Sequence, residues 1–342
     1  MDTAYVYDPV FLEHNLPSHP ENAHRLTHTL DVLEKEGVLS RSTLLSPRPA
    51  TLDEIRLIHT DALIEQVRRV CQSGGGYLDA DTYVNARSYD VALIAAGGLI
   101  HAVEALLNGE IANAFALVRP PGHHATADRA MGFCLFNNIA IAARAAQRHP
   151  DIQRVFIADF DVHHGNGTQD AFAADPSVFY FSTHQYPHYP GSGYWKEIGV
   201  GAGAGTLLYV PLQSRVGDDG YRRIFSELVW PLAERFQPNL ILVSAGYDAH
   251  WSDPLAEMNL SLTGYAQIAR ELVGMANQLC KGRIAFTLEG GYRLEVLAYG
   301  ILNTFYALFG EETILDPVGP SPYADRPVDA IIAHLKDVHY LS

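Results

Sequence analysis

The chain has 342 residues, of which 48% are hydrophobic and 18% charged, and this composition predicts a globular protein with a large core. Its formal net charge of −15 repels nucleic acid and anionic membrane surfaces, so we expect neither as a partner, whereas cationic ligands are attracted at long range. The three cysteines, Cys71, Cys134 and Cys280, are far apart and form no CxxC pair, which argues against a disulfide framework and a thiolate zinc site and suggests a reducing compartment, the cytoplasm.

Neither the N-terminus nor the longest apolar stretch indicates a membrane protein. The N-terminal residues MDTAY lack a basic region followed by an apolar one, so we expect no signal peptide. The longest apolar stretch, residues 91–107, is interrupted by His101 and Glu104. Because a membrane-spanning helix needs about 20 predominantly apolar residues, this stretch predicts a buried helix.

Short β-branched or aromatic runs alternate with longer segments of helical periodicity along the chain. In chain order, the predicted strands are residues 4–7, 114–118, 155–159, 178–182, 207–210, 240–244 and 284–288. The predicted helices are residues 23–36, 61–72, 89–107, 137–147, 221–236, 264–279 and 294–308.

The boundaries of these elements carry further signals. We expect Gly37 to cap the end of the first helix and Thr263 the start of the sixth, and residues 74–76 and 199–205 to form glycine-rich loops. The alternation predicts an α/β fold, in which a central, mostly parallel sheet is flanked by helices, and one domain over residues 1–342.

Four predicted strands are followed by histidine, aspartate or tyrosine together with glycine. These segments are RPPGHH at 119–124, DFDVHHGNG at 159–167, SAGYD at 244–248 and EGGY at 289–292. Ligands of open parallel sheets bind beyond the carboxyl ends of the strands. We therefore expect the four segments to converge on one site.

Asp159, Asp161 and His163 alternate along the second segment, so an extended backbone would project their side chains to one face. Two crowded carboxylates repel each other unless a cation lies between them. Asp161 and His163 together with Asp248 supply three protein ligands and leave an open position, the arrangement of a catalytic zinc. Taken alone, the DxDxH pattern is also typical of a polar loop with a helix cap, and Asp248 of a turn residue.

The tandem His123 and His124 follow two prolines and a glycine, which prevent a helix there. Two imidazoles beside a metal-bound water can serve as general base and electrostatic partner, and Asp159 and Asn166 are available to fix their tautomers. Tyr292 is a candidate hydroxyl donor to a polarised carbonyl oxygen, although a tyrosine packed under a turn fits the same pattern.

The motifs RPPGHHA, GFCLFNN, DFDVHHGNGTQ, SAGYD and LEGGY occur in this order. With them the chain resembles the zinc-dependent histone deacetylases, including their bacterial and acetylpolyamine-hydrolysing relatives, over residues 5–309. The motif HPENAHRL and the asparagine of HHGNG resemble the class II branch more than class I. The resemblance implies a three-layer, arginase-like α/β fold.

The resemblance also implies a role for each candidate residue. The zinc ligands would be Asp161, His163 and Asp248. His124 would be the general base and acid, oriented by Asn166, and His123 its electrostatic partner, oriented by Asp159. Tyr292 would supply the hydroxyl that polarises the carbonyl. In the implied mechanism, zinc and this hydroxyl polarise the amide while His124 takes a proton from the attacking water and then expels the amine.

Further positions of the pocket follow from the same resemblance. Gly132, Phe133 and Tyr189 would form the walls of the acyl-chain tunnel, Asp79 or Asp81 would clamp the substrate at the rim, and Arg25 would line an inner channel for the released acid. A structural K⁺ would bind Asp159, Asp161, His163, Ser182 and Thr183, largely through backbone oxygens.

The substrate remains open between two classes of acetylated amine. Polyamine-specific relatives carry a long early insertion or a glutamate at the pocket gate, whereas this chain has a short early loop and Leu255 at that position. We therefore expect a deacylase of acetyl-lysine peptides that releases acetate, with acetylpolyamine hydrolysis as the alternative. A ureohydrolase would need a second metal site, which Ala249 and His250 do not complete, and a non-catalytic binding protein would tolerate loss of Tyr292, which is present.

Overall fold

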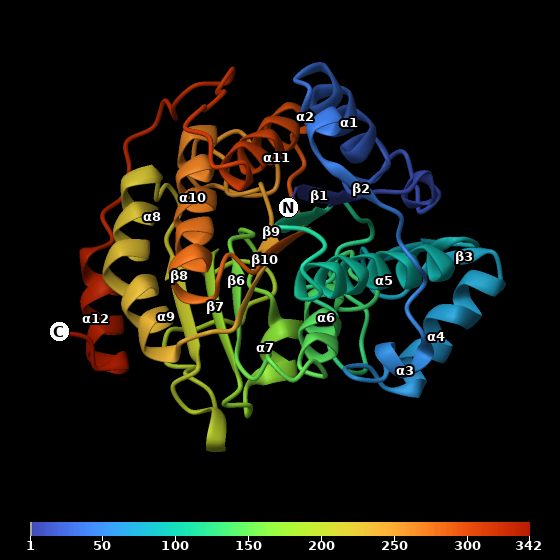
Figure 1. Cartoon of the computed structure of the whole chain (residues 1–342), viewed down its shortest axis with the longest axis horizontal. Helices are drawn as coiled ribbons and strands as arrows, with labels where there is room; N and C mark the ends of the chain where they lie inside the picture. Colours follow the sequence, from blue (N-terminus) through green and yellow to red (C-terminus); the bar gives the residue numbers. More distant parts are fainter. Residues whose placement is uncertain (1) are drawn as a thin grey trace.

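A parallel sheet forms the centre of the computed structural model, which describes residues 2–342 (Figure 1). The first residue, which belongs to the expected domain and to the N-terminal stretch discussed above, lies outside the described residues. Over the described residues the sheet has eight strands in the order β2-β1-β5-β10-β9-β6-β7-β8. The strands are β1 Thr3–Val6, β2 Thr43–Leu45, β5 Asn113–Ala116, β6 Val155–Asp159, β7 Val178–Gln185, β8 Leu207–Leu212, β9 Leu240–Ala245 and β10 Ile284–Leu288.

The neighbouring strands pair in parallel. Six of the strands, β1, β5, β6, β7, β9 and β10, are buried at every position, as expected for parallel strands covered on both faces. All seven predicted strands are confirmed within a few residues, and β6 and β10 have the predicted bounds.

Helices cover the sheet from two sides, which gives three layers. In Figure 1, α5, α6 and α7 lie on one side of the strands, and α8, α9, α10 and α12 lie on the other. The helices are α1 His24–Lys35, α2 Val38–Arg41, α3 Leu52–Ile55, α4 Asp61–Gln72, α5 Ser88–Leu107, α6 Asn138–Ala146, α7 Asn166–Phe172, α8 Asp218–Ile224, α9 Trp230–Phe236, α10 Leu262–Leu279, α11 Leu294–Leu308 and α12 Asp329–His339. The predicted helices are thus confirmed, although the fifth consists of α8, a π-helical turn at Phe225–Val229 and α9.

Helix α5 is long and apolar enough to cross a membrane by length and composition, but 67% of its apolar window is buried inside the protein. It packs against α6 and β5. This confirms the prediction of a buried core helix.

Of the sequence predictions at element boundaries, two are wrong and one is confirmed. Ser261 rather than Thr263 caps α10, because the Ser261 hydroxyl accepts a hydrogen bond from Gly264 N while Thr263 lies inside the helix. The loop predicted at 74–76 includes part of a small antiparallel hairpin, in which β3 Gly75–Tyr77 pairs with β4 Tyr83–Asn85. Gly37 follows the end of α1 with a left-handed φ of 73°, as expected for a helix C-terminus.

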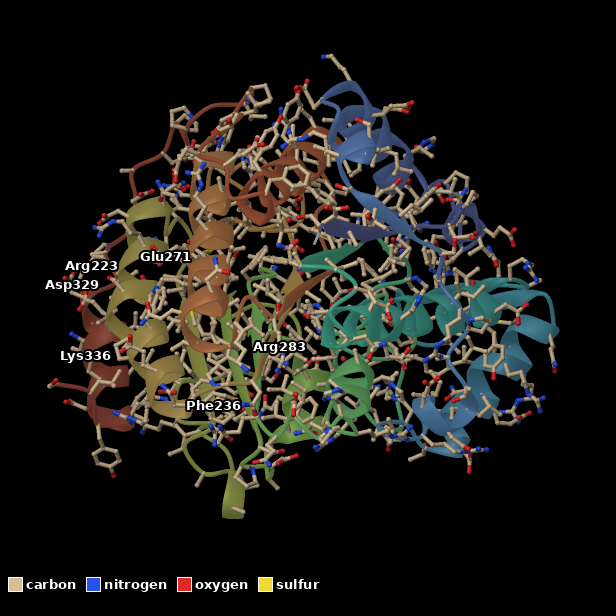
Figure 2. The ribbon with its side chains drawn as sticks, viewed as in Figure 1. Arg223, Phe236, Glu271, Arg283, Asp329 and Lys336 are labelled. Carbon is tan, nitrogen blue, oxygen red and sulfur yellow. The ribbon has the colours of Figure 1, made fainter. Side chains whose placement is uncertain are left out.

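The C-terminal helix α12 was not predicted, and its position is set by contacts with distant segments. Figure 2 labels Arg223 and Glu271 on the neighbouring helices and Asp329 and Lys336 on α12 itself. Arg223 Nη1 lies 2.9 Å from Asp329 Oδ1, and Lys336 Nζ lies 3.0 Å from Glu227 Oε2. Such partly exposed pairs contribute little individually, so the buried Ile332 and Leu335 carry most of the attachment.

Candidate active site

The four polar segments predicted to converge do converge, because the strands before them are consecutive in the sheet. The order β5-β10-β9-β6 places residues 119–124, 289–292, 244–248 and 159–167 at adjacent strand ends. They meet at a cavity of about 240 Å³. Its lining is Asp81, Pro121, His123, His124, Gly132, Phe133, His163, His188, Tyr189, Leu255, Gly290 and Tyr292. Of the predicted site residues, Asp159, Asp161, Asn166 and Asp248 lie behind this lining.

Asp161, His163 and Asp248 form a tight group, in which both carboxylates are buried and His163 is largely buried. His163 Nδ1 lies 3.0 Å from Asp161 Oδ1 and 3.3 Å from Asp248 Oδ2. The three reach this position without the extended backbone that we expected, since β6 ends at Asp159. Beyond it, Asp161 N donates to Asp159 Oδ1 at 3.1 Å and His163 N donates to Asp161 Oδ1 at 2.9 Å. These carboxylates fold the segment into turns, which aim Asp161 and His163 at one point and leave Asp159 facing elsewhere.

The donor set of this group fits a divalent metal such as zinc. One ligand atom from each residue lies within 4.8 Å of the others, and Asp248 Oδ2 is buried without a hydrogen-bond partner. Zinc bonds of about 2.0–2.1 Å in a tetrahedron separate neighbouring donors by about 3.3 Å, close to the distances from His163 Nδ1. Burial lowers the pKa of His163, but the two carboxylates outweigh it and raise the pKa to about 10, so the group favours positive charge.

Two glycines leave the room that these carboxylates occupy. A Cβ on Gly246 would lie 2.1 Å from Asp161 Oδ2, and one on Gly290 would lie 2.1 Å from Asp248 Oδ2. Gly290 N also donates to Asp161 Oδ2 at 2.8 Å. The glycines of SAGYD and LEGGY are therefore required by close approach of the backbone to the acidic group.

The histidine pair is held from behind by two different acceptors. His123 Nδ1 donates to Asp159 Oδ2 at 3.0 Å, and His124 Nδ1 donates to Asn166 Oδ1 at 2.8 Å, with ring centroids 4.0 Å apart. Tyr180 donates its hydroxyl to the same Asp159 oxygen at 2.8 Å. With Nδ1–H engaged in this way, His124 has its Nε2 lone pair free for a proton.

The two histidines have opposite electrostatic environments. Burial lowers the pKa of the His124 imidazole well below its usual value, and the neighbouring His123 and His163 lower it further. Burial also opposes charge on His123, but Asp159 and Asp161 raise its pKa to about 10. A neutral imidazole beside a charged one is the arrangement of a proton acceptor with an electrostatic partner.

Glu289 fixes the loop that carries the histidine pair, a role that the sequence analysis did not assign. Its Oε2 accepts from Gly122 N at 2.7 Å and His123 N at 3.2 Å, and its Oε1 accepts from Ser244 Oγ at 2.9 Å. Glu289 also lies with His123 and Cys134 in a second group of potential metal ligands. Because its carboxylate oxygens already accept these three hydrogen bonds, that group fits a metal less well than the first. The sequence feature that could have drawn attention to Glu289 was its place in the LEGGY motif.

Asp253 connects the predicted gate residue to Tyr292. Its Oδ1 accepts from Leu255 N at 2.9 Å, and its Oδ2 accepts from Tyr292 N at 2.8 Å and Arg293 N at 3.3 Å. Arg25 supports the other side of Tyr292, with its guanidinium 5.2 Å from the ring centroid. We expected Arg25 to line an inner channel; it is fully buried and donates to the carbonyls of the 289–291 loop.

Aromatic side chains line the cavity. Phe133 packs edge-on against Tyr292 with centroids 5.9 Å apart, and Tyr189 packs edge-on against His124 at 5.1 Å. Gly132 is required between them, because a Cβ there would lie 2.4 Å from the His124 ring. Asp81 lies at the exposed end of the lining.

His188 also lines the cavity and was missed by the sequence analysis. Its ring stacks on that of His163 with centroids 5.2 Å apart, and its Nε2 donates to Leu255 O at 3.1 Å. The nearest sequence signal was the segment QYPHYP, whose aromatic Tyr189 was recognised.

Comparisons with known proteins show which family the chain resembles. A family model described as the histone deacetylase domain matches residues 19–308. The chain is 41% identical to the "Probable deacetylase" of Archaeoglobus fulgidus, over 91% of this chain and 87% of that protein. It is 39% identical to "Histone deacetylase 14, chloroplastic" of Arabidopsis thaliana, over 96% of this chain and 83% of that protein. The crystal structure of the HDA15 HD domain matches with a TM-score of 0.90 and 34% identity, over 99% of this chain and 95% of that one.

Proposed function

Since this chain belongs to the histone deacetylase family and is a hydrolytic deacetylase, we propose that it removes acetyl groups from lysine side chains of peptides or proteins and releases acetate. The observation that carries this proposal is the cavity lined by aromatic side chains, which has Leu255 at its rim and contains the neutral His124 and His163 of the acidic group. A linear acyl-lysine fits such a cavity, because its methylene chain can lie between Phe133 and Tyr189.

We propose Asp161, His163 and Asp248 as the ligands of a catalytic zinc ion, in agreement with the zinc dependence of the family. A zinc ion bound there would polarise the amide carbonyl and lower the pKa of a water molecule. We also propose a K⁺ at Asp159, Asp161, His163, Ser182 and Thr183. The hydroxyl oxygen of Thr183, which is buried and has no hydrogen-bond partner, supports a ligand in that region.

The protein's own residues then divide the proton transfers. His124 Nε2 accepts a proton from the attacking water and delivers it to the amine nitrogen as the amide bond breaks. Charged His123, oriented by Asp159, stabilises the negative charge that develops next to it, and Asn166 keeps Nδ1 of His124 protonated. Tyr292 donates its hydroxyl to the carbonyl oxygen, and its backbone is held by Asp253.

The rim favours a peptide over a polyamine. Leu255 is apolar and offers no charge to a second ammonium group, whereas the Asp81 carboxylate can accept hydrogen bonds from a substrate backbone. Asp81 and the net charge of −15 also support the alternative substrate, an acetylpolyamine. We propose the cytoplasm as the compartment, since Cys71, Cys134 and Cys280 are free and buried.

A side-by-side assay tests this function. The purified zinc-loaded protein is given an acetyl-lysine peptide and an N-acetylated polyamine, with Tyr292→Phe as the control variant. We expect turnover of the peptide and a loss of about 10²–10³ in kcat in the variant, the usual cost of removing one donor to a developing oxyanion. A preference for the polyamine would overturn the substrate assignment, and turnover of neither would overturn deacetylation of both classes.

A further inference from the structure

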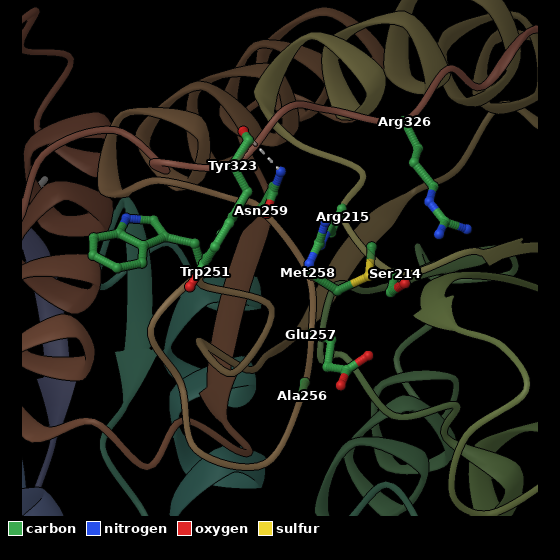
Figure 3. A pocket seen from close by; sticks show the side chains of 9 residues that line it. All are labelled: Ser214, Arg215, Trp251, Ala256, Glu257, Met258, Asn259, Tyr323 and Arg326. Atoms are coloured by element: carbon green, nitrogen blue, oxygen red, sulfur yellow. Dashed lines mark hydrogen bonds between the residues drawn. The ribbon is translucent and has the colours of Figure 1, made fainter.

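A second cavity of about 500 Å³ lies beside the active site, and its lining includes the residue that follows the gate residue in the chain. Leu255 lines the catalytic cavity, whereas Ala256 and Glu257 line the second one. Consecutive Cα atoms are about 3.8 Å apart, so the two cavities share the segment that separates them. Figure 3 shows this cavity with Arg215 and Arg326 on its walls, and we call it the arginine cavity.

Among the described residues, 2–342, no carboxylate pairs with either arginine. Arg215 lies over the ring of Tyr323 at 5.1 Å, and Arg326 Nη1 donates to Gln213 Oε1 at 2.9 Å. Over residues 2–342, neither guanidinium takes part in an ion pair, whereas Arg222 and Arg223 on the adjacent α8 both do. Both side chains are exposed, and two guanidinium groups without an ion pair in one cavity attract anions in a chain with a net charge of −15.

Backbone hydrogen bonds hold the two arginines in position. Arg215 has a left-handed φ of 66°, a conformation that side chains other than glycine rarely adopt. It is held there because Arg215 N donates to Glu257 O at 2.7 Å and Arg215 O accepts from Arg326 N at 2.8 Å. The first bond ties Arg215 to the segment that carries the gate, and the second ties the two arginines to each other.

The charge of the cavity favours one carboxylate over a more highly charged anion. Among its lining residues, two arginines and Glu257 give a formal charge of +1, and the Asp325 carboxylate, which accepts from the lining residue Asn259 at 2.9 Å, lowers the local positive charge further. A carboxylate can accept two parallel hydrogen bonds from one guanidinium, whereas a phosphate dianion would lie near the Glu257 carboxylate with excess negative charge.

We propose that the arginine cavity binds the side-chain carboxylate of an aspartate or glutamate that flanks the acetyl-lysine of a peptide substrate. This inference rests on the proposed peptide deacetylase function. An extended peptide advances about 3.3–3.6 Å per residue, and the two cavities adjoin at Leu255 and Ala256, so we expect a side chain two or three positions from the acetyl-lysine to enter the arginine cavity. The cavity would therefore select acidic peptides and disfavour acetylpolyamines, which carry no carboxylate.

Peptide kinetics test the proposal. Acetyl-lysine peptides carry glutamate or glutamine at each position within three residues of the acetyl-lysine, and kcat/KM is measured for the wild-type protein, Arg215→Gln and Arg326→Gln. Arg69→Gln is the matched control, since Arg69 is exposed on α4 and forms no ion pair within residues 2–342. We expect the wild type and Arg69→Gln to prefer glutamate about two- to fivefold at one or two positions, and both cavity variants to lose this preference.

The outcomes separate the two proposals. A neutral acetyl-lysine amide, too short to reach the arginine cavity, should be turned over equally by all four proteins, and no turnover of it would overturn the proposed function itself. Turnover without a glutamate preference, or a preference that survives in both cavity variants, would overturn the arginine cavity as a substrate site. If Arg69→Gln also loses the glutamate preference, the preference arises from the electrostatic field of the whole protein and not from the arginine cavity. A last outcome is tested with free glutarate. If glutarate alters turnover of the short amide only when both arginines are present, and the peptides show no glutamate preference, then the cavity binds a free carboxylate. The proposal of a peptide site is then wrong.

Discussion

The floor and the rim of the catalytic cavity are held in different ways. At the floor, Asp159, Asp248 and Glu289 are fully buried, and each accepts hydrogen bonds from backbone or side-chain donors of other segments. At the rim, Tyr189 is 38% exposed and Leu255 is fixed through its own backbone. The floor is therefore rigid and carries the chemistry, whereas the rim can vary and carry selectivity. Four changes test this division.

The largest effect is expected at the floor, for Asp248→Asn. The replacement removes a negative charge and one metal-binding oxygen from the acidic group, so we expect the protein to lose tightly bound zinc and at least about 10³-fold in kcat/KM. Metal content after dialysis and deacetylase activity measure the two losses. Asp337→Asn, an exposed site on α12, should change neither, and full zinc content in Asp248→Asn would contradict the assigned ligand set.

The ion cluster behind the floor should affect stability most strongly. Glu21 is fully buried, with its Oε2 2.6 Å from Arg119 Nη2 and its Oε1 3.1 Å from Arg25 Nη1. Removing one partner of such a buried pair costs about 3–5 kcal/mol, so Glu21→Gln should lower the free energy of unfolding by this amount near pH 6.

The same change has a defined pH dependence. Burial alone would raise the pKa of Glu21, but Arg119 and Arg25 lower it to about 2. Because the folded pKa is lower than the unfolded value of about 4.3, the contribution is complete above about pH 5 and is lost as the pH falls towards 2. Urea unfolding at pH 6 and pH 3 should show the difference between the wild type and Glu21→Gln shrinking; a constant difference would mean that packing, not charge, explains it.

Asp253 joins the floor to the rim, so a change there should affect both. Asp253 accepts through both oxygens, and in Asp253→Asn the amide group would face a backbone N–H of either Leu255 or Tyr292. We expect kcat to fall about tenfold through misplacement of Tyr292, with an altered ratio of peptide to polyamine turnover.

Asp8→Asn is the matched control for Asp253. Asp8 lies outside the cavity and accepts from Val10 N at 2.8 Å through Oδ1, so an asparagine can keep this bond with its own oxygen. The control should retain kcat. Equal effects of the two variants would show that Asp253 has no special link to Tyr292.

The floor could be predicted from the sequence because its residues follow strands that are recognisable as continuous apolar runs. Val155–Asp159 was predicted with its correct bounds, and the order of β5, β10, β9 and β6 then brings the motifs together. Residues that act through distant partners could not be predicted. Asp253 reaches Tyr292 across 39 residues and Glu21 reaches Arg119 across 98, and no local pattern encodes such contacts. The turns after Asp159 were missed because the carboxylates of Asp159 and Asp161 accept hydrogen bonds from backbone N–H groups two residues further on. These bonds bend the segment, which was predicted to be extended.

The smallest effect is expected at the rim, for Leu255→Glu. Since the Leu255 backbone is held by Asp253 and His188 whatever its side chain, the new carboxylate should leave the floor unchanged and attract a second ammonium group at the mouth. We expect kcat/KM for an N-acetylated polyamine to rise about fivefold, the effect of one partly exposed ion pair, while the acetyl-lysine peptide changes less than about threefold. Leu255→Gln has nearly the same shape without the charge, and it should not raise polyamine turnover. A gain in Leu255→Gln equal to that in Leu255→Glu would assign the effect to loss of the apolar side chain, and a loss of both substrates would mean that the rim is as constrained as the floor.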